Sequence, residues 1–247
     1  MSPLMIDIDG ATLEAIHVAA PPGAPTLVFL HGALGSVAAW RDFPPTMAAA
    51  LGVGWMAYSR RGHGRSSPLD PPRDTIYLDR EAIDVLPALL ERLGIVRPIL
   101  FGQGDGSAIA LIHAAGAGEP VEAVIVESPL VFIEEKMPAG IRALGRPAHL
   151  GELHDRPDGV FDAWHSIWLS PEFRDWSIAH RLPAIIAPVL AIQGKDNPYA
   201  SVRQIEAISA ASGGRVETLV LEGVGSAPHD EAPISVIEAA RTFIASL

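Results

Sequence analysis

The chain has 247 residues, of which 49% are hydrophobic, and a formal net charge of -11. This length and apolar content fit one large α/β domain with a sizeable core and argue against disorder. The acidic balance and the absence of a Lys/Arg block argue against a nucleic-acid or anionic-membrane surface, and the absence of cysteine excludes disulfides, thiolate nucleophiles and thiolate metal sites.

The N-terminal sequence predicts a β-hairpin, and it lacks the features of an export signal. Residues 5–19, MIDIDGATLEAIHVA, have the pattern of an antiparallel hairpin with its turn at Asp9 and Gly10. The first ten residues lack the basic and apolar segments of a signal peptide. No window reaches the roughly 18 consecutive apolar residues that a membrane span needs. We therefore expect a cytoplasmic protein.

Short β-rich runs then alternate with segments that have the periodicity of amphipathic helices. The runs lie at residues 26–31, 54–59, 97–102, 121–127, 188–194 and 216–223. Such alternation predicts a parallel sheet with helices on both faces. From 131 to 182 only helical patterns appear, so we expect a core domain of residues 1–130 and 183–247 and a helical cap at 131–182. Ligands in such sheets bind beyond the carboxyl ends of the strands, which places the cap over that crevice.

Short motifs follow the predicted strands, and their order resembles that of the α/β-hydrolase fold. The motifs are HGALGS (31–36), SRRGHGRSS (59–67), GQGDGS (102–107), QGKDNPY (193–199) and GVGSAPHDEAP (223–233). The whole chain is similar to the capped hydrolases of small acids and esters. That group holds carboxylesterases, enol-lactonases and the C–C hydrolases of meta-cleavage pathways. The resemblance implies a mostly parallel sheet, helices on both faces, a helical cap and a catalytic triad at the strand ends.

The triad positions that this resemblance implies hold residues of non-catalytic types. The family nucleophile sits at the centre of G-x-S-x-G on a sharp strand-to-helix turn. Gly102 and Gly106 occupy the flanking positions, which leaves Gly104 at the centre. The acid position corresponds to Asn197 and the histidine position to Ser226. Serine-based nucleophilic attack is therefore not expected.

Other groups at the strand ends are candidates for the remaining chemistry. The resemblance implies an oxyanion pocket made by the backbone N–H groups of Ala33 and Asp105, which does not depend on side chains. Glu127 ends the fourth β-rich run, where burial would favour its protonated form, and is a candidate acid or base. A solvated carboxylate at the strand end is the alternative. His229 lies three residues after Ser226. It is the second candidate, with a structural role as the alternative.

Several residues are candidates for contacting a ligand. Arg61 belongs to the basic loop at 59–67 and is suited to a carboxylate, although such loops are also held by their own hydrogen bonds. His31 begins the predicted oxyanion turn, where anchoring the backbone is the alternative to a ligand contact. Trp164, His165 and Trp168 share one face of a predicted helix in the cap. That face would seal the cap and form the roof of a pocket for a flat or apolar ligand.

No metal and no cofactor are predicted. HExxH and clustered metal-ligand spacings are missing, and the glycines at 102, 104 and 106 do not follow G-x-G-x-x-G. We expect a small-molecule ligand, a carbonyl or carboxylate compound, and the sequence defines no oligomeric state. Three functions stay open: an enzyme with non-covalent acid/base chemistry of isomerase, lyase or cyclase type, a non-catalytic binding protein, and an ester or C–C bond hydrolase with a misaligned or relocated triad.

Overall fold

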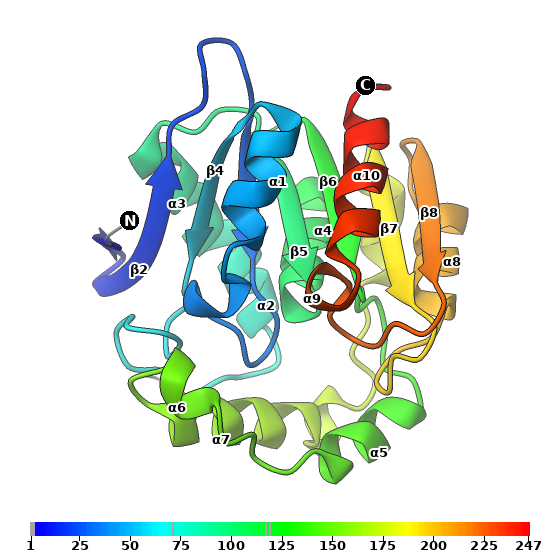
Figure 1. Ribbon diagram of the computed structural model, residues 1–247. Helices are drawn as coiled ribbons and strands as arrows, with labels where there is room; N and C mark the ends of the chain where they lie inside the picture. The colour runs from blue at the N-terminus through cyan, green and yellow to red at the C-terminus, as the bar shows by residue number, and fades with distance from the viewer. Residues whose placement is uncertain (1–2, 71, 117, 119) are drawn as a thin grey trace.

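The fold is built on one twisted sheet (Figure 1). The computed structural model describes residues 3–70, 72–116, 118 and 120–247. Its strands are β1 (Leu4–Ile8), β2 (Ala11–Val18), β3 (Thr26–Leu30), β4 (Gly54–Tyr58), β5 (Ile99–Gln103), β6 (Ala123–Glu127), β7 (Val189–Gly194) and β8 (Val216–Leu221). Each predicted β-rich run overlaps one of β3 to β8, and the N-terminal hairpin is β1–β2. The predicted strands are confirmed.

The strands are ordered β1-β2-β4-β3-β5-β6-β7-β8. β1 and β2 pair antiparallel, as do β2 and β4, whereas all pairs from β4 through β8 are parallel. The parallel strands therefore bring the ends of β3, β5, β6 and β7 to the same edge. Motifs that are far apart in the sequence meet there.

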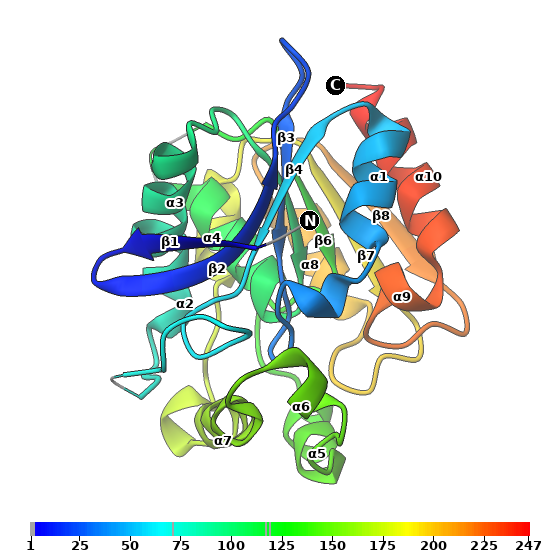
Figure 2. The same ribbon diagram turned by 60° about the vertical axis from the view of Figure 1, so that its left-hand side comes forward.

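Helices cover both faces of the sheet (Figure 2). On one face lie α1 (Phe43–Leu51) and α10 (Pro233–Ile244), and on the other lie α3 (Leu86–Leu93), α4 (Asp105–Gly116) and α8 (Arg203–Ala211). The shorter elements are η1 (Ala38–Trp40), α2 (Tyr77–Arg80), η2 (Glu81–Val85), η3 (Pro171–Phe173), η4 (Ala179–Ala184) and α9 (Pro228–Glu231). Every helix in the described part of the chain is too short or too polar to cross a membrane.

The central strands are buried on both faces, as a parallel sheet between two helical layers requires. All five residues of β3, TLVFL, are buried. Phe43, Met47 and Phe243 pack on one face in a single hydrophobic cluster. Leu86 and Ile109 belong to a second cluster on the opposite face. This two-sided packing fixes the positions of the strand ends that carry the site.

Three helices lie beyond the carboxyl ends of the parallel strands: α5 (Lys136–Ala143), α6 (Leu150–Leu153) and α7 (Pro157–Trp168) (Figures 1 and 2). We call them the helical layer. Phe132 and Ser177 form an isolated β-bridge, and the N–H of Ile178 donates to the Val131 carbonyl at 2.8 Å. The segment that carries the layer therefore leaves and rejoins the sheet domain at adjacent points.

The turn between β5 and α4 depends on its glycines. A single residue, Gly104, separates the two elements, with a φ of +54°. A Cβ added to Gly106 would lie 1.8 Å from the Leu30 carbonyl oxygen. A Cβ on Gly102 would lie 2.4 Å from the Gly106 carbonyl oxygen. The flanking glycines thus allow α4 to approach the sheet closely.

We expect Gly106→Ala to lower the free energy of unfolding by about 3 kcal/mol, because the new methyl group would clash with backbone that cannot move aside. Urea denaturation measures this loss. Gly159→Ala is the matched control, since a Cβ there meets nothing within 4 Å and α7 continues through it. The control should gain up to about 1 kcal/mol. Equal stability of the two variants would contradict the described turn.

Candidate functional site

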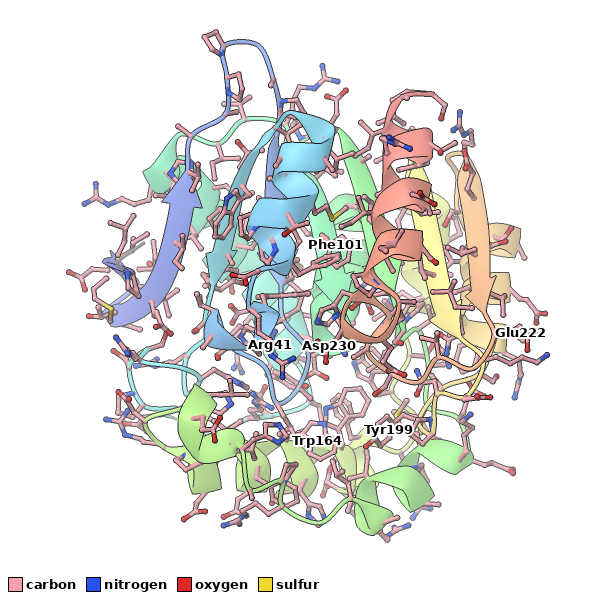
Figure 3. The ribbon with its side chains drawn as sticks, viewed as in Figure 1. Arg41, Phe101, Trp164, Tyr199, Glu222 and Asp230 are labelled. Carbon is pink, nitrogen blue, oxygen red and sulfur yellow. The ribbon has the colours of Figure 1, made fainter. Side chains whose placement is uncertain are left out.

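A cavity of about 680 Å³ lies at the carboxyl ends of the parallel strands. This size is within the range of small-molecule sites. Its lining includes residues from the turn after β3, the β5–α4 turn, the helical layer and the loop before α9. Figure 3 shows Arg41 and Asp230 side by side between the sheet and the helical layer, with Trp164 and Tyr199 nearby. The cavity therefore sits where the sequence predicted a ligand crevice.

A carboxylate and an imidazole meet at one wall of this cavity. Glu127, at the tip of β6, is 0% exposed. Its Oε2 accepts a hydrogen bond from the backbone N–H of His229 at 2.9 Å, and its Oε1 pairs with Nδ1 of the same residue. The two residues are 102 positions apart in the chain. The structure thus joins the two acid/base candidates into one pair.

The loop around α9 holds His229 in place. The Glu231 carboxylate accepts hydrogen bonds from the N–H groups of Gly225 at 2.7 Å and Ala227 at 3.0 Å. The His229 ring packs against Trp40 and Phe43, with ring centroids 4.6 and 5.4 Å away. The imidazole is therefore oriented by the carboxylate on one side and by aromatic rings on the other.

The second ring nitrogen of His229 is available for chemistry. Because Nδ1 donates to the Glu127 carboxylate, the neutral ring has its lone pair on Nε2. Within the described residues Nε2 has no hydrogen-bond partner, and His229 lines the cavity. This arrangement allows Nε2 to take a proton from a bound molecule.

The environment also changes the affinity of His229 for a proton. Burial by itself lowers the pKa of His229, but the charge of Glu127 and its hydrogen bond outweigh that effect. The pKa is raised above the ordinary value of 6.5. Glu127 therefore stabilises the imidazolium that proton transfer would create.

Gly104 faces the same cavity and carries no reactive group. The backbone N–H of Asp105 begins α4, where no acceptor exists within the helix. Ala33 lies in a turn closed by the hydrogen bond from Gly35 N–H to the Gly32 carbonyl at 3.1 Å. Both Ala33 and Asp105 line the cavity. Their role as an oxyanion site stays a prediction.

The other two residues at predicted triad positions do not form a pair. The Oδ1 of Asn197 accepts hydrogen bonds from the N–H groups of Tyr199 at 2.9 Å and Ala200 at 3.3 Å, so this side chain stabilises its own turn. Ser226 lines the cavity, and its carbonyl accepts a hydrogen bond from Gln103 Nε2 at 2.9 Å. The carboxylate that meets a histidine comes from β6 and not from the loop after β7.

His31 has a structural role and does not line the cavity, which corrects the predicted ligand contact. Its Nε2 accepts from the Arg60 N–H at 3.0 Å, and its Nδ1 donates to the Gly32 carbonyl at 2.8 Å. Burial, followed by the charge of Arg60, lowers the pKa of His31 well below 6.5. A neutral ring with both nitrogens satisfied has no group left for a ligand.

Arg61 and His165 also lie away from the cavity lining. The Nε of Arg61 donates to the Pro68 carbonyl at 3.2 Å in an exposed contact. The His165 ring stacks on Phe161, with centroids 5.5 Å apart. The geometry does not support the ligand contacts predicted for these two side chains. Helical periodicity predicted that His165 shares a face with the two tryptophans. In the structure, its side chain is not on the part of α7 that lines the cavity.

Trp164 and Trp168 do line the cavity. The Nε1 of Trp168 donates to the Tyr77 hydroxyl at 3.0 Å, and that hydroxyl donates to Asp105 Oδ2 at 2.7 Å. This chain connects the helical layer to the β5–α4 turn and fixes the Asp105 side chain. Tyr77 was not among the residues predicted from the sequence, because no motif surrounds it.

Ser128 is a second residue that sequence reasoning missed. It follows Glu127, lines the cavity and is only 3% exposed. Its hydroxyl has no hydrogen-bond partner among the described residues. The only feature of the sequence that could have pointed to Ser128 is its position directly after Glu127 at the end of a predicted strand.

The site combines a parallel sheet, a glycine-flanked strand-to-helix turn and a histidine, and the turn and the histidine line one cavity. This is the architecture of hydrolase-type α/β proteins. The chain belongs to the alpha/beta hydrolase family, which residues 27–240 match.

Individual relatives are more distant. The chain is 25% identical over 200 residues to 2-succinyl-6-hydroxy-2,4-cyclohexadiene-1-carboxylate synthase of Salmonella paratyphi C, covering 81% of this chain and 73% of that protein. The enol-lactonase of Burkholderia xenovorans superposes with a TM-score of 0.74 at 16% identity, over 98% of this chain and 100% of that one. Carboxylesterase CesB of Bacillus subtilis has a TM-score of 0.72 at 19% identity, over 100% and 92%. These structural likenesses show the fold alone.

Proposed function

We propose that the protein is an enzyme that binds a small carbonyl compound in the cavity and acts by non-covalent acid/base chemistry. His229 is the proposed base, and Glu127 orients and stabilises it. The observation that carries this proposal is the buried Glu127–His229 pair beside a turn whose central residue, Gly104, has no nucleophile. The general base of a triad is thus present without the serine that it would activate.

In the proposed reaction, Nε2 of His229 removes a proton from the carbon next to the ligand carbonyl. The enolate oxygen accepts hydrogen bonds from the N–H groups of Ala33 and Asp105. The imidazolium then returns the proton to another atom or to a leaving group. Return of the proton to another atom gives an isomerase reaction. Expulsion of a leaving group by the enolate, with the proton going to that group, gives a lyase reaction. Attack of the enolate carbon on an electrophilic carbon of the same ligand, whose displaced electron pair takes the proton, gives a cyclase reaction. A positioned base typically contributes about 10²- to 10⁴-fold to the rate.

The relatives are named for more than one class of reaction. The curated relative is named as a synthase, while two of the similar solved structures are named as a lactonase and a carboxylesterase. The family fold therefore serves more than one reaction class, and the side chains at the site decide which.

Hydrogen–deuterium exchange tests the proposed base directly. The probe is 1-phenylpropan-2-one in D₂O, and proton NMR follows the loss of its methylene signal. We expect the wild-type protein to accelerate exchange and His229→Gln to reduce it to the buffer rate, because no other group occupies the position of Nε2.

His165→Gln is the matched control for this experiment, since it changes a histidine of α7 that does not line the cavity. It should exchange the probe at the wild-type rate. If wild type and His229→Gln both accelerated exchange equally, the assignment of His229 as the base would fail. If both exchanged the probe at the buffer rate, the non-catalytic binding protein would be the better hypothesis.

Hydrolysis by an activated water is the second candidate. Apart from its chain neighbours, a Cβ added to Gly104 would come within 4 Å of one atom of the described residues, the Gly32 Cα at 3.8 Å, so the place of the missing side chain is open. A water in that place would be deprotonated by His229 and would attack a carbonyl held by the same backbone donors. Product analysis in H₂¹⁸O distinguishes it from proton transfer, because only hydrolysis incorporates the label.

A further inference from the structure

Ser128 has an unusual backbone conformation for its residue type. Its φ is +47°, in the left-handed region that favours glycine. Its backbone N–H donates to the Ile192 carbonyl at 2.9 Å, which holds the residue at the end of β6. Strained residues of this kind persist where the surrounding structure fixes them, and they cluster at ligand sites.

The Ser128 hydroxyl is also unsatisfied within the protein. The Oγ is inaccessible and has no hydrogen-bond partner among the described residues. A buried hydroxyl without a partner destabilises the fold. Strain and an unsatisfied group thus coincide at one residue of the cavity wall, directly after the general-base partner Glu127. Because the Oγ is inaccessible in the observed rotamer while Ser128 lines the cavity, a contact with a ligand requires rotation about χ1 to another staggered rotamer. In that rotamer, a ligand oxygen that accepts from the hydroxyl would satisfy it.

The charges around the cavity indicate what kind of ligand carries that oxygen. Carboxylates line it at Asp105, Glu152 and Asp230, whereas Arg41 is the guanidinium in the same lining. Arg41 is already paired with Asp230 at 3.0 Å. A positive charge on His229 would be balanced by Glu127. A carboxylate ligand would therefore meet net repulsion, while an uncharged carbonyl compound would not.

We propose that Ser128 contacts the substrate by donating a hydrogen bond to an oxygen of an uncharged carbonyl compound. This inference deepens the proposed function, since it rests on the cavity being the substrate site. It narrows the expected ligand from a carbonyl or carboxylate compound to an uncharged one. It also assigns a binding role to a residue outside the triad positions.

The test compares Ser128→Ala with wild type by calorimetric titration and by thermal unfolding. The probes are 1-phenylpropan-2-one and phenylacetate, which share the phenyl and methylene groups and differ in charge. We expect the wild type to bind the ketone more tightly than phenylacetate. Ser128→Ala should bind the ketone about 3- to 10-fold more weakly, the effect of one hydrogen bond.

The same variant should unfold at a temperature about 2 to 4 °C higher, because it removes an unsatisfied buried hydroxyl. Ser128→Gly should be at least as stable, since it also relieves the left-handed strain. A residue with a merely structural role would lose stability in these variants. Weaker binding together with higher stability is the signature of a group placed for a ligand.

Ser212→Ala is the matched control. Its hydroxyl is also buried and has no hydrogen-bond partner in the described part of the chain, but it lies at the end of α8 and not in the cavity lining. It should gain stability and keep the wild-type affinity. Unchanged ketone affinity in Ser128→Ala, tighter binding of phenylacetate than of the ketone, or no ketone binding to wild type would each overturn the inference.

The two proposals fail separately. If the ketone binds through Ser128 but His229→Gln exchanges its protons as fast as wild type, the substrate contact stands and the base assignment fails. If exchange depends on His229 but Ser128→Ala binds the ketone as tightly as wild type, the proposed function stands and the inference about Ser128 fails.

Discussion

Gly104→Ser alone is expected to make the protein an esterase. The substitution adds an alcohol at the centre of the strand-to-helix turn, on the cavity wall that also carries His229. The new Cβ meets Gly32 Cα at 3.8 Å, an ordinary contact. Hydrolysis of p-nitrophenyl acetate should rise by at least about 10²-fold, because the Glu127–His229 pair supplies the general base. Mass spectrometry after a fluorophosphonate should find one adduct, on the introduced serine.

Two further variants test the reason for this gain. His229→Gln in the Gly104→Ser background should abolish the esterase activity. Asn197→Asp in that background should add little, because the Asn197 side chain is committed to its own turn. The left-handed φ of +54° makes the serine variant less stable, by about 1 to 2 kcal/mol. An esterase that appeared only with Asn197→Asp and Ser226→His together would restore the triad positions inferred from the sequence.

The scaffold of the site could be predicted because local patterns determine it. Continuous apolar runs such as TLVFL at 26–30 are typical of parallel strands that are buried on both faces, and this run is fully buried. The glycines around Gly104 reveal the sharp turn because a Cβ at Gly102 or Gly106 would meet backbone. These features depend on neighbours in the chain or on close packing that permits one residue type.

The pairing at the site could not be predicted from such patterns. Glu127 and His229 are 102 residues apart, and only the sheet register brings the tip of β6 to the start of α9. Motif spacing pointed instead to Asn197 and Ser226, because a motif fixes the loop but not the direction of a side chain within it. The strain at Ser128 is likewise invisible in sequence, since serine gives no sign of a positive φ.

Glu127→Gln is expected to cause a large loss of exchange activity although the proposed base, His229, is unchanged. An amide carries no charge to stabilise the imidazolium, and its N–H₂ can donate to Nδ1 and so place the ring proton on Nε2. The exchange rate of 1-phenylpropan-2-one should fall about 10²- to 10⁴-fold. Glu222→Gln is the control, because its carboxylate is on the surface, far from the cavity, and pairs with Lys195.

The pH dependence of exchange should change in a defined direction. In wild type the rate should rise with pH through a midpoint above 6.5, because the neutral imidazole is the base and its pKa is raised. In Glu127→Gln the burial that lowers the pKa of His229 remains, while the charge and hydrogen bond of Glu127, the two largest effects that raise it, are gone. The midpoint should therefore move to lower pH. A midpoint unchanged by the substitution would show that Glu127 does not govern the titration.

The pH dependence of the melting temperature should reveal the Glu127–His229 interaction without any ligand. Since folding raises the pKa of His229 above 6.5, the native state binds this proton more tightly than the unfolded state. The resulting stabilisation is complete below 6.5 and is lost as the pH rises through the raised pKa. The difference in melting temperature between wild type and Glu127→Gln should therefore be greatest below pH 6.5 and shrink at higher pH.

His31 and His63, whose pKa values burial lowers, act in the opposite sense, but they are common to both proteins and cancel in the difference. A difference that stayed constant or grew with rising pH would mean that Glu127 stabilises the fold without interacting with a protonated His229.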